Sequence, residues 1–317
     1  MPQELPLVSI VTPSLNQGRF IEETILSIKN QTYPNIEHII VDGGSTDNTL
    51  EIIKKYDGYY NMLWLSEPDE GQSDAINKGW KMSNGEIIAY LNSDDTYLPL
   101  AVETAVSWLA GHKDVGMVYG DCNNIDESGE VIDQYPATDF DLEDMLCGHN
   151  MIPQPAVFLR KDVIKEVGYL DTHLHRTMDY DLWLRIGLKC KVGYIRQLLA
   201  SFRIYPEMKG MREGYKFADD RLYVLNKLFS ASDLPEEVMA LRRRACSYAH
   251  LRVGTNYYSQ RRMGPARKHL LKAITLHPRN LRQPSLTAYL LTSLLGGTIG
   301  TRMMEIAVNC KSKLVKV

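Results

Sequence analysis

Residues 36–47 read Ile-Glu-His-Ile-Ile-Val-Asp-Gly-Gly-Ser-Thr-Asp. The first seven are rich in β-branched and apolar side chains, which is typical of a buried strand. The two glycines that follow let the backbone turn tightly, and Thr46 then opens a pattern of apolar residues spaced three to four apart. A strand that turns directly into a helix is the unit from which parallel sheets with crossover helices are built.

The same unit recurs from residue 7 to about residue 120, so the sequence predicts an α/β fold: a Rossmann-like, mostly parallel central sheet flanked by helices. Asn16 and Ser45 are predicted helix caps. The predicted strands are Leu7–Thr12, Ile36–Asp42, Met62–Glu67, Glu86–Asn92 and Val115–Asp121. The predicted helices are Arg19–Gln31, Thr46–Tyr56, Gln72–Met82 and Leu98–Gly111.

The pattern changes twice further along the chain. A hairpin is predicted over Asn123–Tyr135, a helix near Asp141–Cys147 and a strand at Ala156–Arg160. After about residue 215 the pattern is helical throughout, and residues 257–278 resemble one helix-turn-helix unit of the tetratricopeptide type, which we expect to act as a packing module. We therefore predict a catalytic domain at 1–220 and an all-α, basic extension at 221–317.

Composition narrows the class of protein. The five cysteines are widely spaced, which favours neither a disulfide framework nor a zinc site. The chain begins without the basic start and apolar stretch of a signal peptide. The longest apolar stretch, Leu286–Ile299, is shorter than the roughly 20 residues of a membrane-spanning helix. We expect a cytoplasmic protein.

The net charge of −3 conceals an uneven distribution, because residues 240–317 hold 15 Lys and Arg but one acid. A basic segment suits phosphate groups, either on an anionic membrane or on nucleic acid. The helices lack interleaved aromatic residues and a nucleic-acid motif, so we expect no nucleic-acid partner. Peripheral contact with the inner face of an anionic membrane is the favoured interpretation.

Acids stand at the predicted strand ends, where ligands bind in such sheets. Asp42 can accept the ring N–H of a nucleotide base, although it could also cap the helix after it. Asp94 and Asp95 follow an apolar strand, and burying both needs compensation. A divalent cation, Mg²⁺ or Mn²⁺, held by Asp94 and two phosphates would supply it. The alternative role of Asp94, a helix cap, suits Asp95 or Thr96 better.

Three ordered motifs make the sequence resemble family 2 glycosyltransferases, which have the fold called GT-A. The motifs are Val8–Ser14, Val41–Asp47 and Asn92–Asp95, the last in place of the family's DxD, and residues 66–79 extend the likeness. The resemblance implies a nucleotide-sugar site formed by Thr12, Pro13, Asp42, Asp69, Lys78, Asn92, Ser93 and Asp94. Lys78 could equally be a solvated lysine on a helix.

The segment Met178–Arg185 resembles the family's ED motif, which implies that Asp179 is the general base, with Asp181 as a cap or supporting group. Gln154 is implied as a partner of the acceptor. The sequence departs from the family twice. Asn92 stands where many relatives have Asp, and Tyr205 replaces a histidine in a flexible loop over the diphosphate, where Arg203 or Lys209 would supply positive charge.

The combination predicts a metal-dependent, inverting glycosyltransferase that moves a sugar, with a UDP-sugar favoured as donor, to a saccharide or lipid-linked saccharide in polysaccharide or glycolipid assembly. A sugar nucleotidyltransferase is an alternative, but it would carry a glycine-rich basic loop after the first strand, and residues 13–16 do not. A second alternative is an inactive nucleotide-binding scaffold acting through its helical extension, which the presence of Asp42, Asp94 and Asp179 disfavours.

Overall fold

The computed structural model describes residues 5–148, 152–213, 216–282 and 284–294. The chain forms two compact units. The first comprises Met1–Leu142 and Asn150–Arg212, and the second comprises Glu143–His149 and Glu213–Val317. The predicted boundary at residue 220 lies inside helix α9 (Phe217–Leu228), in the second unit.

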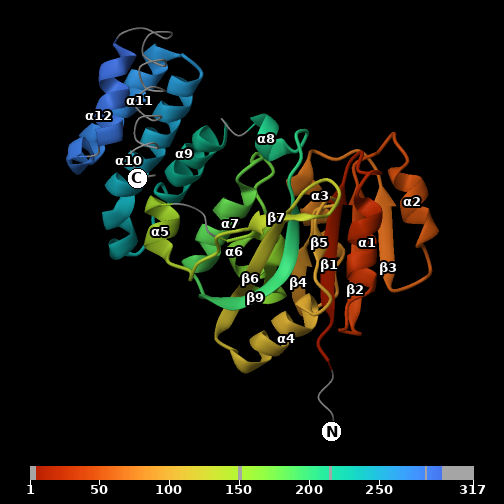
Figure 1. Ribbon diagram of the computed structural model, residues 1–317. Coiled ribbons are helices and arrows are strands. Elements are labelled where there is room, and N and C mark those ends of the chain that lie inside the picture. The colour runs from red at the N-terminus through yellow and green to blue at the C-terminus, as the bar shows by residue number, and fades with distance from the viewer. Residues whose placement is uncertain (1–4, 149–151, 214–215, 283, 295–317) are drawn as a thin grey trace, which may run out of the picture. The chain divides into compact units, whose positions relative to one another are not determined.

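A single mixed sheet forms the centre of the first unit, with strands in the order β3-β2-β1-β4-β8-β6-β9-β5 and β7 paired to β6 (Figure 1). Its first half is parallel and consists of β1 (Val8–Ser14), β2 (Ile36–Asp42), β3 (Met62–Ser66) and β4 (Ile87–Tyr90). The helices between these strands are α1 (Ile21–Lys29), α2 (Thr49–Lys55) and α3 (Gln72–Met82).

The second half of the sheet contains both strand directions, because β8 runs antiparallel to β4 and β6 whereas β9 runs parallel to β6. Its strands are β5 (Thr96–Tyr97), β6 (Val115–Ile125), β7 (Val131–Gln134), β8 (Val157–Arg160) and β9 (Lys191–Arg203). Its helices are α4 (Ala101–Gly111), the short 3-10 turn η1 (Gln154–Ala156), α6 (Lys161–Val167), α7 (Met178–Gly187) and α8 (Lys209–Glu213).

Helices cover both faces of the sheet. Successive side chains of β1 point to opposite faces, so each face of this strand packs against different helices. Ile10 points into a core that α1 and α4 complete, while Val11 points to the opposite face, toward α3. A Cβ placed on Gly79 of α3 would lie 2.4 Å from Val11 Cγ1, so only glycine lets this helix approach the strand so closely. The helix is thereby fixed against the centre of the sheet.

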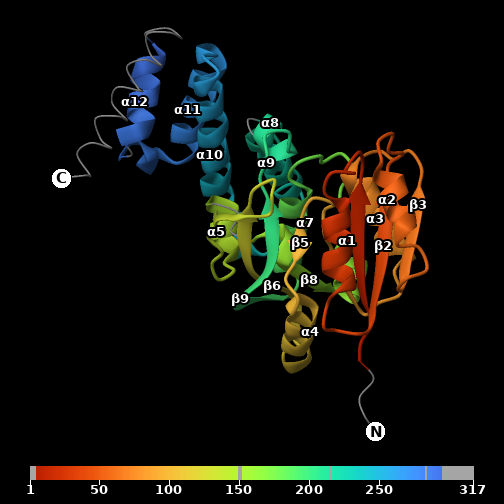
Figure 2. The ribbon, with the colours of Figure 1, turned by 45° about the vertical axis from the view of Figure 1, so that its right-hand side comes forward.

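The second unit is helical (Figure 2). Its longest helices are α10 (Glu236–Ser259) and α11 (Met263–Leu276), and Leu270 of α11 packs against Gly254 of α10. The short turn η3 (Pro278–Arg282) and α12 (Pro284–Ser293) follow, and α5 (Leu142–Cys147) belongs to this unit. None of the helices in the described part of the chain has the length and apolarity needed to cross a bilayer.

The predicted elements of the first 170 residues are all present, with ends that differ by a few residues. Strand β9, which the sequence analysis did not predict, carries several charged and polar residues and is recognised only through its pairing with β6. The predicted caps are wrong, because α1 and α2 begin at Ile21 and Thr49. The Asn16 side chain instead accepts the Thr46 amide, and the Ser45 hydroxyl accepts the Asn16 amide. The Thr49 amide donates to the Asp47 carboxylate.

Candidate active site

The polar residues predicted to bind the donor lie at one edge of the sheet. Ser14, the last residue of β1, is paired with Asp42, the last residue of β2. On the other side of β1, the Leu91 amide donates to the Val11 carbonyl, so residues 92–95 leave β4 at the same edge. Asp42 and Asp94 therefore stand at the carboxyl ends of neighbouring parallel strands, where ligands bind in sheets of this type.

Asp42 is fully buried and holds the glycine-rich turn together. Its Oδ2 accepts hydrogen bonds from the amides of Gly44 (3.0 Å) and Ser45 (2.9 Å) and from the Ser66 hydroxyl (2.7 Å), and its Oδ1 accepts from the Ser45 hydroxyl. Its role as a reader of the base stays a prediction, and the geometry adds a structural role that the sequence did not reveal. Gly44 has a φ of 87°, which suits glycine alone.

The turn after β1 is joined to the turn after β2. Asn16, with a φ of 53°, accepts the Thr46 amide on its side chain at 2.8 Å, and its own amide donates to the Ser45 hydroxyl at 2.7 Å. Beneath them the Thr12 hydroxyl lies 2.8 Å from His38 Nε2, and burial lowers the pKa of His38 to about 3, so this ring is neutral. Thr12 and the adjacent Pro13 are buried within β1, and their contact with the donor stays a prediction.

Asp69 and Lys78 lie beside this turn. The Asp69 carboxylate is packed against Gly43, where a Cβ would meet Asp69 Oδ2 at 2.6 Å, and its Oδ1 accepts the Gly71 amide at 2.8 Å. Lys78 is held by two carboxylates, Glu67 at 3.0 Å and Asp74 at 3.2 Å, and these ion pairs raise its pKa. A phosphate at Lys78 would compete with both acids.

Asp94 and Asp95 are two adjacent acids in the turn after β4, and Ser93 is buried beside them. Burial raises the pKa of both carboxyls, and the charge of Asp94 raises that of Asp95 further. Asp95 is bonded inside the protein, by the Arg203 amide at 3.0 Å and by Asn92 at 3.1 Å. Asp94 accepts the Tyr205 hydroxyl on Oδ2 at 2.8 Å, and no other side chain of the described residues bonds its carboxylate.

A chain of hydrogen-bonded side-chain amides, from Gln72 through Asn92 to Gln154, holds the turn that follows β4. Asn92 accepts from Gln72 Nε2 at 2.6 Å and donates to Asp95 and, at 3.0 Å, to Gln154 Oε1. Gln154 in turn donates to the Tyr90 carbonyl at 2.8 Å. Both the oxygen and the nitrogen of the Asn92 side chain are thus hydrogen-bonded within the protein. An amide suits this position because its nitrogen donates two of these bonds, which a carboxylate could not do. The predicted contacts of Asn92 and Gln154 with substrates stay predictions.

The role of Asp94 as a ligand of a divalent cation stays a prediction. Asp94 supplies a hard oxygen donor, which is the ligand type that Mg²⁺ and Mn²⁺ prefer. Among the described residues no group of three His, Cys, Asp or Glu side chains could hold a metal. A divalent ion here would therefore need further oxygen ligands from outside the protein, and the phosphates of a nucleotide are such ligands.

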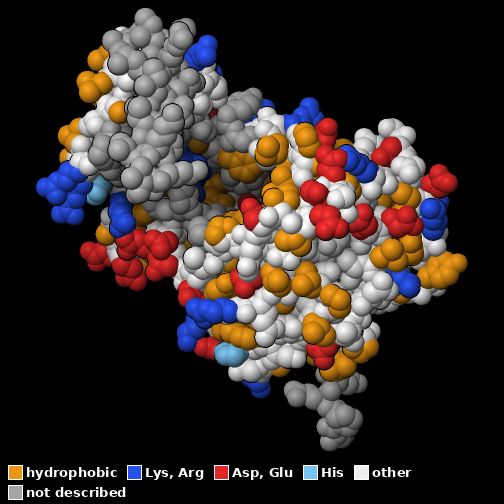
Figure 3. Space-filling model, in the orientation of Figure 1, with side chains coloured by type: hydrophobic (Ala, Val, Ile, Leu, Met, Phe, Trp, Pro, Cys, Tyr) orange, Lys and Arg blue, Asp and Glu red, His pale blue; other side chains and the backbone are white. Residues whose placement is uncertain are grey.

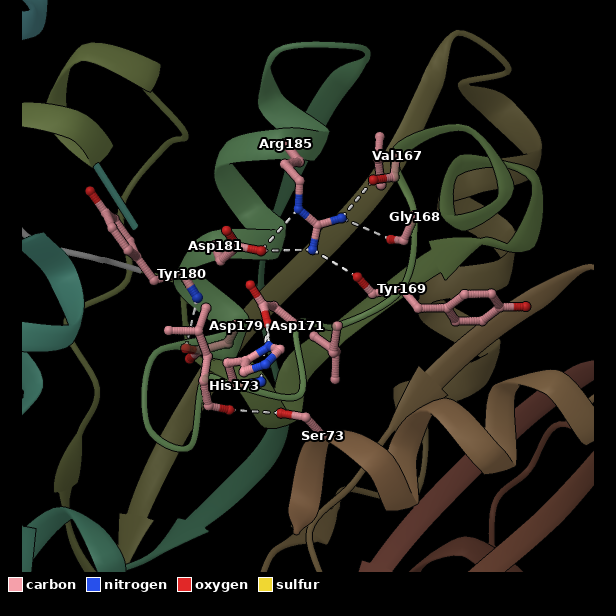
Figure 4. A network of polar contacts seen from close by, with 12 residues as sticks. Ser73, Val167, Gly168, Tyr169, Asp171, His173, Asp179, Tyr180, Asp181 and Arg185 are labelled. Carbon is pink, nitrogen blue, oxygen red and sulfur yellow. Dashed lines mark hydrogen bonds and ion pairs between the residues drawn. The ribbon is translucent and has the colours of Figure 1, made fainter. Parts of the chain in front are cut away.

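Asp179 is the second residue of α7 and its Oδ1 accepts the Tyr180 amide at 2.7 Å (Figure 4). Burial raises the pKa of its carboxyl to about 6. Burial raises the pKa of Tyr90 on β4 and of Tyr135, the charge of Asp179 raises both further, and Asp95 acts on Tyr90 as well. Asp179 therefore lies close to the strand that carries the Asp94 turn, although 85 residues separate the two in the chain.

Asp181 is directed away from Asp179, toward Arg185 (Figure 4). It is buried and pairs with two nitrogens of the Arg185 guanidinium, Nε and Nη2, at 2.9 Å each. Asp181 is thus neutralised by an arginine one turn further along its own helix. The arrangement agrees with a supporting role for Asp181.

The expected loop position of Arg203 is wrong, because the residue ends β9 and is buried. Its guanidinium donates to the carbonyls of Asp94 (2.9 Å), Asp126 and Glu127 and pairs with Glu23, so its donors serve the fold. Tyr205 does lie in the segment after β9, packed on Phe20 with 5.0 Å between ring centroids. Lys209 begins α8, and its side chain lies outside the described part of the structure.

Comparison with known proteins places this chain in a family of enzymes. The sequence profile described as glycosyl transferase family 2 matches residues 9–168. An uncharacterized glycosyltransferase of Mycobacterium tuberculosis is 30% identical over 200 residues, which cover 62% of this chain and 75% of that protein. Glycosyltransferase AglE of Haloferax volcanii is 29% identical over 180 residues, which cover 55% of this chain and 59% of AglE.

Two solved structures have a similar fold. Staphylococcus aureus TarS 1–349 in complex with UDP-GlcNAc superimposes with a TM-score of 0.69 at 18% identity and 90% coverage of both chains. The mannosyltransferase PcManGT of Pyrobaculum calidifontis, in complex with GDP-Man and Mn²⁺, has a TM-score of 0.60 at 17% identity and covers 93% of this chain and 88% of its own. The fold is of the GT-A type. The chain belongs to glycosyl transferase family 2.

Proposed function

We propose that the protein is a metal-dependent, inverting hexosyltransferase that moves a sugar from a nucleotide-diphosphate sugar, with UDP favoured as the nucleotide, to a saccharide or lipid-linked saccharide in polysaccharide or glycolipid assembly. What supports the proposal is that Asp94 stands in the turn after β4 and that the charge of Asp179 acts on Tyr90, the last residue of that strand. Asp94 has carboxylate oxygen left for a cation, and Asp179 has a pKa of about 6. A base with such a pKa is largely unprotonated at neutral pH.

The reaction follows from these two groups. A hydroxyl oxygen of the acceptor attacks the anomeric carbon of the donor, the bond from that carbon to the diphosphate oxygen breaks, and Asp179 takes the hydroxyl proton. Attack from the face opposite the diphosphate inverts the anomeric configuration. A divalent cation, when bound at Asp94, would neutralise charge on the departing diphosphate. The Asp42 turn, with Asp69 packed against Gly43, would hold the nucleoside.

A donor screen tests this proposal. UDP-, dTDP- and GDP-sugars, each with and without Mn²⁺ or Mg²⁺, are compared by thermal unfolding of the protein. We expect one nucleotide to raise the melting temperature only when the metal is present, because a ligand of the folded state stabilises it by mass action. Stabilisation by none of them would contradict the proposal, and metal-dependent release of pyrophosphate from a sugar phosphate and a nucleoside triphosphate would favour a nucleotidyltransferase.

Tyr205→Phe is expected to weaken Mn²⁺ binding by roughly 10- to 100-fold, which is the usual effect of removing a hydrogen bond to a metal-ligating carboxylate. The Tyr205 hydroxyl donates to Asp94 Oδ2, and this bond would hold the carboxylate in place while Oδ1 bound the ion. Calorimetric titration of Mn²⁺ into the protein saturated with UDP measures the affinity. Tyr60→Phe, which removes a buried hydroxyl bonded to His38 instead, serves as the control. Equal affinities in the Tyr205 variant and the native protein would refute this role.

We also propose that the protein acts in the cytoplasm and that its helical unit contacts the anionic inner face of the membrane. Residues 240–294 contain eleven Arg and Lys and no Asp or Glu. Figure 3 shows Lys and Arg side chains next to apolar ones along the edge of this unit. Exposed apolar residues in this stretch include Leu271, Leu281, Leu291 and Leu294. Basic residues beside apolar ones are the composition that holds a helix at a membrane surface.

Flotation with vesicles tests the membrane contact. The triple variant Lys268→Ala, Lys272→Ala, Arg279→Ala removes three exposed charges, each worth about 1 kcal/mol at an anionic surface, so we expect roughly 100-fold weaker binding to phosphatidylserine vesicles. The variant Lys29→Ala, Lys113→Ala, Lys189→Ala makes the same change of charge on the first unit and is expected to float like the native protein. Equal flotation of both variants would end the proposal.

A further inference from the structure

The segment that delivers Asp179 to the site has no regular structure. Residues 168–177, here called the base loop, connect the end of α6 to the start of α7, and Asp179 follows two residues later. Thr177, the N-cap residue of α7, makes no capping bond with its side chain, and its buried hydroxyl has no hydrogen-bond partner in the structure. The start of α7, and with it Asp179, is therefore not fixed by a cap of its own.

Arg185, one turn further along α7, holds the beginning of the base loop (Figure 4). Its Nη1 donates to the carbonyls of Val167 at 2.7 Å and Gly168 at 2.8 Å, and its Nη2 donates to that of Tyr169 at 3.0 Å. Nε and Nη2 also donate to Asp181 at 2.9 Å, which neutralises the charge of the partly buried guanidinium. One planar side chain thus ties three consecutive carbonyls to the helix that carries Asp179.

Helix α3 holds the same loop from the other side. Asn77 donates to the Leu170 carbonyl at 2.9 Å and accepts the Leu170 amide at 3.0 Å, so both groups of its side-chain amide are used. Ser73 donates to the Leu174 carbonyl at 2.9 Å (Figure 4). Both side chains are buried. Because Gly79 lets α3 lie directly on β1, these bonds connect the base loop to the strands that end in the donor side of the site.

We propose that Arg185 and Asn77 are positioning residues for the reaction, because together they fix Asp179 relative to the donor. The inference rests on the proposed function and adds a positioning role to the motif of residues 66–79, for which the family resemblance implies a place in the nucleotide-sugar site. Neither residue touches a substrate in this role. A misplacement of about 1 Å at a catalytic group can lower the rate 100-fold, so loosening the loop should slow catalysis while the donor still binds.

Arg185→Lys is the direct test, because a lysine ammonium has three donors and cannot span Asp181 and three carbonyls. We expect kcat for transfer to fall about 10- to 100-fold, while KM for the donor and metal-dependent stabilisation by the donor change less than threefold. Arg160→Lys is the matched control. Arg160 also binds three carbonyls, those of Leu109, His112 and Val115, but it lies opposite Ile87, at the start of β4 and the far edge of the sheet. The melting temperature of Arg160→Lys should fall about as much as that of Arg185→Lys, while its kcat stays at the native value.

Asn77→Ala provides a second variant that leaves every Arg185 contact in place, so the test does not depend on one substitution folding. It should show the same loss of kcat with unchanged donor binding. A native kcat in Arg185→Lys and Asn77→Ala would overturn the inference. A loss of kcat in Arg160→Lys equal to that in the other two variants would also overturn it, because the bonds of Arg185 and Asn77 would then serve stability alone. A native protein that neither binds nor turns over any nucleotide sugar would instead overturn the proposed function, and the inference with it.

Discussion

Asp179→Asn protein is expected to bind donor and metal as the native protein does, yet to transfer sugar more slowly by a factor on the order of 10²–10⁴, the usual contribution of a general base. The amide has nearly the same shape and can still accept the Tyr180 amide, which now bonds Asp179 Oδ1, so the start of α7 should keep its conformation. Initial rates of transfer and metal-dependent thermal stabilisation by the donor are measured together. Weakened donor binding in this variant would assign Asp179 to the donor site.

The pH dependence provides an independent check of the same residue. Burial raises the pKa of Asp179 to about 6, and a base acts only when it is deprotonated, so kcat/KM should fall as pH drops through about 6 and level off above it. The residual activity of Asp179→Asn should lack this acidic limb. A limb that persists unchanged in the variant would show that another group takes the proton.

Asp94→Ala should lose the metal-dependent stabilisation by the donor, along with donor hydrolysis and transfer. At a donor concentration 100 times its Kd, the native protein gains about 2.7 kcal/mol from binding, and this gain should disappear in the variant. Without ligand the variant should unfold no earlier than the native protein, because burial and the neighbouring Asp95 make an ionised Asp94 costly.

The matched control for this variant is Asp133→Ala, which removes an exposed carboxylate from β7. It should keep both the metal-dependent stabilisation and the activity. Full donor stabilisation of Asp94→Ala by the metal would show that the cation is held elsewhere.

The arrangement of the donor side could be predicted because it follows from short-range rules. Buried strands have a readable pattern, parallel strands align their carboxyl ends, and residues after Val41 and Leu91 must then meet at one edge. Gly43 and Gly44 could be predicted as turn residues from their type. These rules do not require knowing which side chains touch. They correctly place Asp42 and Asp94 at the carboxyl edge of the sheet.

The partners of the polar side chains could not be predicted, because they come from segments far apart in the chain. Arg203 was expected to face phosphate, but its place at the end of β9 turns it to the carbonyls of Asp94 and the β6–β7 hairpin. Asn92 and Gln154 looked like substrate contacts, and they form one amide chain. A buried Asn or Gln follows a motif equally well whether it binds ligand or protein, so residue type alone does not separate the two.

We propose that Asp94 and Asp179 border the diphosphate of the donor, that the Asp42 turn borders its nucleoside, and that Asp94 would hold the divalent cation. Crystals grown with Mn²⁺ and UDP, measured at the manganese absorption edge, locate the ion by its anomalous scattering. The account predicts a manganese peak bonded to an oxygen of Asp94, the uracil against the Asp42 turn, and the Asp179 carboxylate facing the free side of the diphosphate. An ion away from Asp94, or a diphosphate on a surface that Asp179 does not border, would contradict it.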